Sequence, residues 1–208
     1  RMKSLNNWLL VLSVLSCFGC SSPVHEDDRG CAFVSDSIQY RVEFMSAGCV
    51  RILSFPEGDT LVTRRLVVDS EKPAFKDYKW EDTGQKLLFR TRELSVVFDK
   101  ADVAFTFQET STGKLLLKEK GDRKARNFKR SVAGGEQCLE VTQRFVPTED
   151  EAIYGLGQYQ NGIMNYRGKS VLLLQANMDI VNPFLISTNG YGAVSYTHLR
   201  AHETGAYL

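Results

Sequence analysis

Amide and carboxylate side chains gather between glycine-rich turns in the last quarter of the sequence. The set contains no pairing of a nucleophile with a base, so it does not indicate covalent catalysis. Amides both donate and accept hydrogen bonds, and aromatic rings cover sugar faces, so the pattern suits a hydroxyl-rich ligand. The polar members are Gln158, Gln160, Asn161, Asn165, Gln175, Asn177 and Asp179, and the interleaved rings are Tyr159, Tyr166 and Phe184.

His198 and His202 have a spacing that resembles a metal motif. They stand four residues apart, with Glu203 beside the second, and on a helix this spacing would place both imidazoles on one face. The sequence supplies no third ligand, and the three cysteines that follow residue 30 are too widely spaced for a zinc site. We therefore expect no metal, no cofactor and no disulfide.

The remaining carboxylates give little sign of catalysis. Asp99, Asp102 and Glu140 fall at the ends of predicted strands or at alternating polar positions, which is typical of a solvated surface. The sequence has no Ser-His-Asp order and no phosphate-binding glycine loop, and G-L-G-Q at 155–158 lacks the rest of a dinucleotide fingerprint.

Composition and charge argue against a nucleic-acid partner. The chain has 208 residues, of which 43% are hydrophobic and 25% charged, and its net charge is +1. A nucleic-acid-binding protein needs a basic face to neutralise phosphates. The one basic cluster, at 118–130, also contains Glu and Asp, so we interpret it as a solvated loop between strands.

The first 36 residues have the composition of an export signal and a linker. Lys3 and the apolar run at 8–15 are typical of a signal peptide, and S-C-F-G-C-S-S at 16–22 resembles a bacterial lipobox. We expect a lipoprotein signal peptide over 1–20 with lipidation at Cys20 (or Cys17), followed by a linker over 21–36. The protein would then be exported and membrane-anchored, in the periplasm or at the cell surface. A cleaved, unlipidated signal peptide is the alternative.

Alternating apolar and polar residues dominate the chain from residue 37 onward. Strands are predicted at 38–44, 49–55, 66–69, 80–82, 86–92, 94–99, 103–109, 115–119, 139–145, 152–154 and 171–174, with a hairpin turn at 111–114. No window has a sustained period of 3.6 residues, so little helix is expected. Many short strands joined by turns indicate a mainly β fold, an antiparallel β-sandwich over 37–194.

Gly155 and Gly157 bracket a single apolar residue directly after one of these strands. Glycine is used where the backbone needs a positive φ or where another backbone approaches too closely for a side chain. We expect a tight, shaped turn here.

The order of the motifs in this region is more specific than their composition. Y-G-L-G-Q, N-Y-R-G, L-L-Q-A-N-M-D-I, P-F-L-I-S and G-Y-G follow one another between residues 154 and 192. This order resembles the N-terminal, galactose-mutarotase-like β-sandwich of glycoside hydrolase family 31, in particular its α-xylosidases. A weaker likeness extends back to about residue 37.

The resemblance implies a retaining glycosidase, which needs two carboxylates about 5–5.5 Å apart. In the family both are aspartates of a (β/α)8 barrel that follows the sandwich. The present sequence has no alternation of helix and strand patterns, so we expect an incomplete sandwich without that barrel and a fragment without activity of its own. The implied partner is an oligosaccharide with α-linked xylose, such as one derived from xyloglucan; α-glucosides and α-galactosides stay open.

One site residue follows from the resemblance. In the family, an aspartate of an Asn-x-Asp-like motif in a sandwich loop contacts the sugar near the cleavage point, and Asn177-Met178-Asp179 matches that motif. Asp179 and, more weakly, Asn177 are therefore expected to bind substrate. The alternative is that Asp179 only caps a turn before Pro183, because Asp commonly bonds nearby backbone amides.

The final residues, 195–208, do not continue the family pattern. S-Y-T-H-L-R-A-H-E-T resembles a peptide translated from non-coding library sequence, so we expect an artefactual tail. Two other functions stay open for the chain: a non-catalytic, surface carbohydrate-binding lipoprotein, and a structural sandwich without affinity for glycans.

Overall fold

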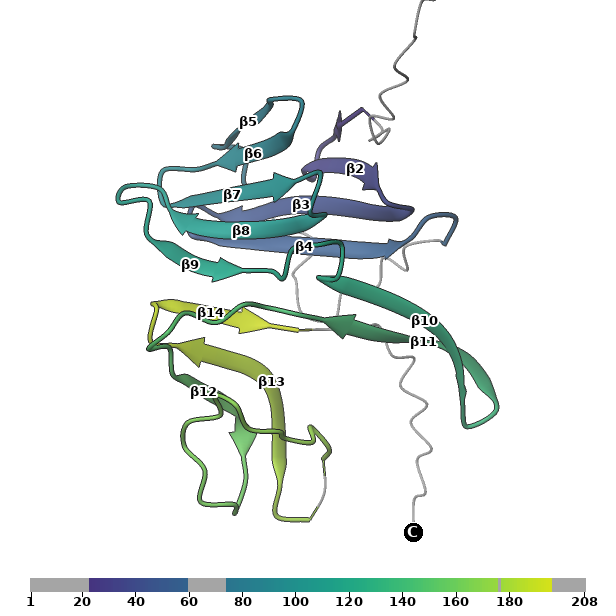
Figure 1. The fold of residues 1–208 in the computed structure, drawn as a ribbon, viewed down its shortest axis with the longest axis vertical. Helices are drawn as coiled ribbons and strands as arrows, with labels where there is room; N and C mark the ends of the chain where they lie inside the picture. The colour runs from purple at the N-terminus through teal and green to yellow at the C-terminus, as the bar shows by residue number, and fades with distance from the viewer. Residues whose placement is uncertain (1–22, 60–73, 176, 196–208) are drawn as a thin grey trace, which may run out of the picture.

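The protein is built from short antiparallel strands. A computed structural model describes residues 23–59, 74–175 and 177–195, and within these ranges every regular element is a β-strand (Figure 1). The described strands form four antiparallel sheets of four, five, two and three strands. Among the same residues, no helix is long and apolar enough to cross a membrane. The prediction of a mainly β, antiparallel sandwich is confirmed.

Two of the sheets face each other and form the sandwich (Figure 1). The first contains β1 (His25–Glu26), β2 (Cys31–Ser35), β3 (Ile38–Ser46) and β4 (Cys49–Pro56). The second contains β5 (Lys79–Asp82), β6 (Lys86–Arg90), β7 (Leu94–Asp99), β8 (Ala104–Glu109) and β9 (Leu115–Lys118). In both, neighbours along the chain are neighbours in the sheet, as a meander of hairpins requires.

Aromatic side chains fill the space between the two sheets. Phe33 and Tyr40 come from the first sheet, Phe98 and Phe105 from the second, and each is at most 4% exposed. The ring centroid of Phe98 lies 4.8 Å from those of both Phe33 and Phe105, within the range of favourable aromatic pairs. The period-2 pattern of the strands therefore produces one continuous hydrophobic core.

The linker predicted over 21–36 is wrong where it overlaps β1 and β2. The side chains of β2 alternate strictly, with Cys31, Phe33 and Ser35 buried. The strand pairs with β3 from Cys31↔Val42 to Ser35↔Ile38, so it belongs to the sandwich. The strand is only five residues long, and one of its inward positions is Ser, which weakens the apolar alternation.

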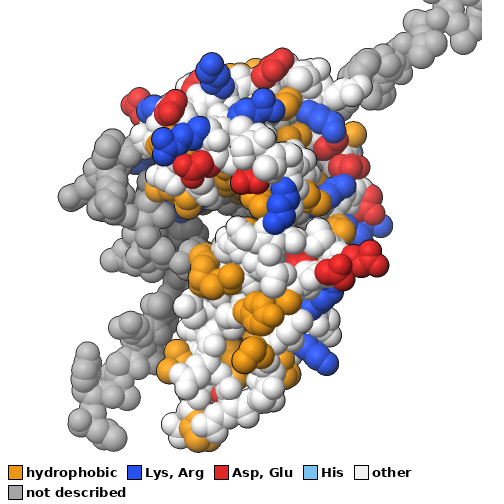
Figure 2. Space-filling view, turned by 90° about the vertical axis from the view of Figure 1, so that its left-hand side faces the viewer, with side chains coloured by type: hydrophobic (Ala, Val, Ile, Leu, Met, Phe, Trp, Pro, Cys, Tyr) orange, Lys and Arg blue, Asp and Glu red, His pale blue; other side chains and the backbone are white. Residues whose placement is uncertain are grey.

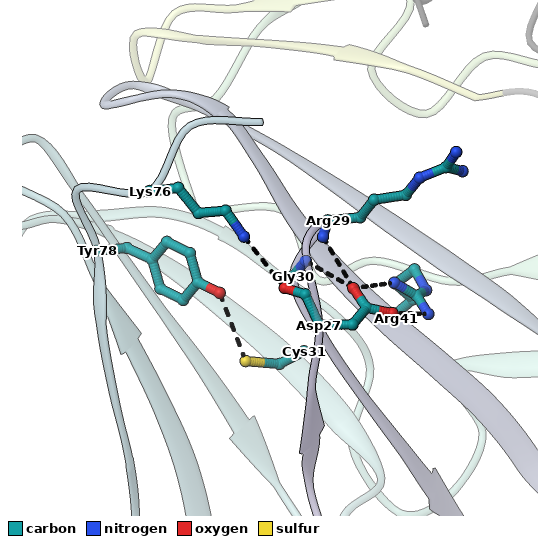
Figure 3. Close-up of polar contacts among 7 residues, drawn as sticks. All are labelled: Asp27, Arg29, Gly30, Cys31, Arg41, Lys76 and Tyr78. Carbon is teal, nitrogen blue, oxygen red and sulfur yellow. Dashed lines mark hydrogen bonds and ion pairs between the residues drawn. The ribbon is translucent and has the colours of Figure 1, made fainter. Parts of the chain in front are cut away.

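The acidic stretch before β2 is held by specific pairs and is not free chain (Figure 3). Asp27 accepts two hydrogen bonds from the Arg41 guanidinium, at 2.8 and 2.7 Å, and two more from the backbone amides of Arg29 and Gly30. These bonds, chiefly those of Arg41, hold the pKa of Asp27 far below its ordinary value. Lys76 binds the Asp27 carbonyl oxygen at 3.1 Å, which ties this stretch to the chain before β5.

The loop predicted over 118–130 is also wrong in its second half, where β10 (Arg126–Ala133) begins. The Arg126 side chain is only 8% exposed and pairs with the carboxylate of Glu119, which is 1% exposed. Its guanidinium carbon lies 5.4 and 5.2 Å from the ring centroids of Tyr40 and Phe105. Burial raises the pKa of Glu119, so the pair is a desolvated one and not part of a solvated loop.

The remaining strands lie beside the sandwich. β10 pairs with β11 (Glu136–Gln143) as a two-stranded ribbon, and β12 (Ile153–Gln158), β13 (Ile180–Ser187) and β14 (Tyr191–Val194) form a separate sheet below β9 (Figure 1). The chain between them is joined to the sandwich by a β-bridge from Glu119 to Phe145. Lys114 also donates to the Asn189 carbonyl oxygen at 2.9 Å, connecting the β8–β9 turn to the β13–β14 turn.

Several predictions fall outside the described residues or differ in detail. The leader over 1–20 with Cys17 and Cys20, the strand at 66–69, and the tail after Ser195 lie outside them. No strand forms at 171–174, where Leu172, Leu173 and Leu174 are exposed. The other predicted strands correspond to β3 to β9, β11 and β12, with ends shifted by a few residues.

Candidate functional site: a cavity beside a glycine bulge

A glycine bulge in β12 shapes the sheet that carries the predicted site residues. Gly155 pairs with Leu185 and Gly157 with Val181, so one residue of β12 stands opposite three of β13. Gly155 and Gly157 have φ values of +98° and +119°, and Leu156 between them has +66°. A Cβ on Gly157 would lie 2.0 Å from the carbonyl oxygen of Ile180. Both glycines are therefore required, as the sequence predicted.

The long connection from β12 to β13 folds back on itself and borders a shallow, open cavity of about 320 Å³. Its start and its end meet there, because Asp179 directly precedes β13. The lining residues are Tyr159, Gln160, Asn161, Ser170, Val171, Leu172 and Asp179. Four of the amide, aromatic and carboxylate residues singled out in the sequence thus come together around one cavity.

Asp179 has the environment of an available carboxylate. It is half-buried, and its carboxylate makes no hydrogen bond or ion pair with any residue that the structure describes. A turn cap would instead accept bonds from nearby backbone amides. It stands directly before β13 and after Met178, whose φ is +70°.

The neighbouring amides have separate tasks. The Gln175 side chain donates to the Asp179 carbonyl oxygen at 2.9 Å and accepts from the Val181 backbone amide at 3.1 Å. It therefore supports the backbone on both sides of the start of β13. Asn177 is exposed in the turn and is not among the residues that line the cavity. Asn165 accepts from the backbone amides of Ile153 and Arg167, so it too serves the framework.

Two residues that sequence reasoning missed hold the base of this connection. Glu151 is 3% exposed and accepts from the hydroxyls of Ser187 at 2.5 Å and Tyr191 at 2.6 Å and from the Thr148 backbone amide at 2.9 Å. Burial alone would raise the pKa of Glu151, but these bonds outweigh it and hold the pKa below its ordinary value.

Arg167 completes this anchor from the other side. Its guanidinium donates to the carbonyl oxygens of Thr148 and Glu151, the latter at 2.8 Å. Apart from the Thr148 amide, which lies three positions from Glu151, the partners of Glu151 and Arg167 lie between 16 and 40 positions away along the chain, so local spacing could not have identified this anchor.

Apolar side chains are unusually exposed in this half of the protein. Figure 2 shows charged side chains concentrated over the sandwich. Hydrophobic side chains gather over the part below it, which holds β12 to β14 and the connection between β12 and β13 and is called the lower part from here on. Exposed large hydrophobic residues of this lower part are Tyr154, Met164, Leu172, Leu173, Leu174, Met178, Ile180, Ile186 and Val194. Patches of this kind mark surfaces that contact other protein or ligand.

Metal-binding groups are not a feature of the described site. No cluster of three or more His, Cys, Asp or Glu side chains that could hold a metal ion occurs in residues 23–59, 74–175 and 177–195. Cys31, Cys49 and Cys138 are free thiols. His198, His202 and Glu203 lie outside these ranges. Asp99, which the sequence predicted to be a surface group, accepts hydrogen bonds from the backbone amides of Ala101 and Asp102 at the end of its own strand.

Comparison with known sequences identifies relatives of this fold. Residues 39–198 match the family described as the glycosyl hydrolase 31 N-terminal galactose mutarotase-like domain. Over 171 residues the chain is 32% identical to an α-xylosidase of Saccharolobus solfataricus, which covers 75% of this chain and 22% of that protein. Over 67 residues it is 39% identical to an uncharacterized family 31 glucosidase of Pseudescherichia vulneris, covering 32% of this chain and 12% of that protein.

Solved structures of α-xylosidases from the same family contain a part with a similar fold. The GH31 α-xylosidase of Xanthomonas citri superposes with a TM-score of 0.68 at 29% identity, over 81% of this chain and 18% of that one. A GH31 α-xylosidase from a soil metagenome, complexed with xylose, superposes with a TM-score of 0.62 at 25% identity. The match covers 82% of this chain and 27% of that one. The chain thus spans between about an eighth and a quarter of the length of these proteins.

Proposed function

Because this chain belongs to glycoside hydrolase family 31, through the family's N-terminal galactose mutarotase-like domain, we propose that the whole protein hydrolyses α-linked xylosides. Support for xylosides comes from the relatives, since the similar proteins include α-xylosidases and one of them was solved with xylose. We also propose that this domain helps to shape the substrate site.

The observation that carries the second proposal is the Asp179 carboxylate beside the cavity. It is half-buried, unpaired among the described residues, and accompanied by a tyrosine ring and amide groups. Sugar hydroxyls donate well to a carboxylate, and such charge-assisted bonds contribute about 1.5–3 kcal/mol. Asp179 would hold a substrate hydroxyl near the bond that is cleaved. Asn177, exposed in the same turn and outside the cavity lining, is the weaker candidate for substrate binding.

Catalysis itself is assigned to another part of the protein. Retaining hydrolysis needs a nucleophile and an acid/base, two carboxylates about 5–5.5 Å apart. The family's catalytic domain is not among these 208 residues, which match its N-terminal domain. The chain by itself is therefore expected to be inactive, and the domain's role is in substrate binding.

Turnover measurements test the proposal. The protein expressed from its complete coding sequence should release nitrophenol from nitrophenyl α-xyloside faster than from the matching α-glucoside and α-galactoside. The 208-residue chain should do no better than an empty-vector control. A preference for another sugar would overturn the xyloside assignment. Tight glycan binding without hydrolysis of any α-glycoside would favour the alternative, a carbohydrate-binding lipoprotein.

We further propose that the protein is exported and anchored by a lipidated Cys20, or Cys17. The support is the leader pattern and the S-C-F-G-C-S-S motif. Detergent phase partitioning of cell extracts should place the wild type in the detergent phase and Cys20→Ala in the aqueous phase. Partitioning unchanged by Cys20→Ala but abolished by Cys17→Ala would move the lipid to Cys17, and aqueous wild type would rule out the anchor.

A further inference from the structure

We propose that Tyr159 is a sugar-stacking residue of this cavity, which holds the apolar face of a pyranose ring while Asp179 binds its hydroxyls. This inference rests on the proposed carbohydrate function of the site and adds a second contact residue to it. It stands on the position of the tyrosine ring in the cavity lining, next to the glycine bulge.

The hydroxyl group of Tyr159 is already committed to the framework. It donates to the carbonyl oxygen of Leu156 at 3.0 Å. Leu156 is the bulge residue with φ of +66°, and it has no partner in the β12–β13 ladder. Its carbonyl oxygen is therefore free for Tyr159, and the two glycines beside it make this backbone conformation accessible.

With the hydroxyl bonded to Leu156, the ring is the part of the side chain that is left for a ligand. Tyr159 is half-buried and lines the cavity together with Asp179, which stands at the end of the same connection. Burial raises the pKa of Tyr159, with smaller contributions from Tyr166 and from the Asp179 carboxylate. A fixed ring next to a hydrogen-bond acceptor suits a sugar, which has apolar C–H faces and polar edges.

The rest of the cavity has the same chemistry. Asn161 accepts from the Ile163 backbone amide at 2.9 Å, which leaves its amide nitrogen as a donor beside Gln160 and Ser170. A volume of about 320 Å³ is at the small end of ligand pockets, which span about 300–1,000 Å³.

Conservative variants separate stacking from a purely structural role. Tyr159→Phe keeps the ring and removes the bond to Leu156, whereas Tyr159→Leu and Tyr159→Ala remove the ring. If the residue stacks, Tyr159→Phe should bind sugar within about twofold of wild type, and Tyr159→Ala and Tyr159→Leu should bind about 3- to 10-fold more weakly. If its role is the bond to Leu156, Tyr159→Phe should lose as much as Tyr159→Ala.

The experiment is a binding titration of the protein expressed from its complete coding sequence. Xylose, glucose and galactose are titrated by saturation-transfer difference NMR against wild type and the three variants, with melting temperatures recorded for each. Weaker binding by the ringless variants at an unchanged melting temperature supports the stacking role.

The outcomes distinguish this inference from the proposed function. If a sugar other than xylose binds and Tyr159→Ala weakens it, the xyloside assignment fails and stacking stands. If xylose binds equally to wild type and Tyr159→Ala, stacking fails and the proposed function stands. If none of the three sugars binds the wild type, both fail.

Discussion

Asp179 and Glu151 are carboxylates of the same sheet region, but their surroundings give them different roles. Glu151 is 3% exposed and has three hydrogen-bond donors, so it is committed to the fold. Asp179 is half-buried and has no partner among the described residues, so it is available to a ligand. The sequence motif could point to Asp179, whereas Glu151 could not be recognised, because its partners Ser187 and Tyr191 are distant along the chain.

Replacing Glu151 should change both stability and its dependence on pH. Glu151→Gln leaves the Thr148 amide or a hydroxyl without its acceptor, which should cost about 1–3 kcal/mol of unfolding free energy at pH 7. The pKa of Glu151 is lowered on folding, so the unfolded chain takes up this proton first as pH falls. Wild type should therefore lose this contribution below the ordinary pKa of 4.5.

Urea unfolding between pH 3 and pH 7 is the measurement for this prediction. The difference in unfolding free energy between wild type and Glu151→Gln should shrink as pH falls. Asp28 is exposed, so Asp28→Asn serves as the control and should have the same unfolding free energy as wild type at each pH. A difference that stays constant across this range would contradict the proposed role of the charge.

At the scale of elements, strands were predictable where apolar alternation was long, as in β3 and β7. β10 was missed because R-N-F-K-R-S-V-A is rich in charge and pairs only within a two-stranded ribbon. The apolar run at 171–174 was read as a strand, but hydrophobicity does not reveal which surface covers a segment. β2 was missed because it is short and buries a serine.

The glycine bulge offers a sharp prediction at this scale. Gly157→Ala would place a Cβ 2.0 Å from the carbonyl oxygen of Ile180, next to Asp179, at a φ of +119°. We expect a loss of more than about 2 kcal/mol, because both the clash and the strained backbone contribute. Gly134→Ala is the matched control, since its φ is +59° and nothing lies within 4 Å of its Cβ position. It should cost about 1 kcal/mol.

Denaturant unfolding of wild type and both glycine variants measures these losses, and Gly157→Ala should be clearly less stable than Gly134→Ala. Equal losses for Gly157→Ala and Gly134→Ala would mean that the close approach at the bulge does not exist in solution.

The whole molecule combines a well-packed sandwich with a lower part that exposes apolar side chains (Figure 2). The chain also spans only 22% of the length of its α-xylosidase relative. The antiparallel sandwich could be predicted from its pattern and its resemblance. The exposed surface could not, because exposure depends on how the elements pack and not on residue type.

This surface predicts how the 208-residue chain behaves on its own. It should bind a hydrophobic dye such as ANS and self-associate at micromolar concentration. Leu174→Lys combined with Met178→Lys should reduce both effects at an unchanged melting temperature, since these side chains are 58% and 73% exposed. Light scattering and dye fluorescence check this. A monomeric wild type without dye binding would show that the lower part is not an exposed apolar surface.

The most direct test of the account is the effect of Asp179→Ala on α-xyloside hydrolysis by the protein from its complete coding sequence. Loss of a charge-assisted bond of about 1.5–3 kcal/mol should lower kcat/KM by about 10- to 150-fold. The melting temperature should change little, because the carboxylate supports no described contact. Asp28→Ala, an exposed aspartate distant in sequence from the cavity, should hydrolyse like wild type. A large loss of stability with normal kcat/KM in the folded fraction would show instead that Asp179 serves only the turn before β13.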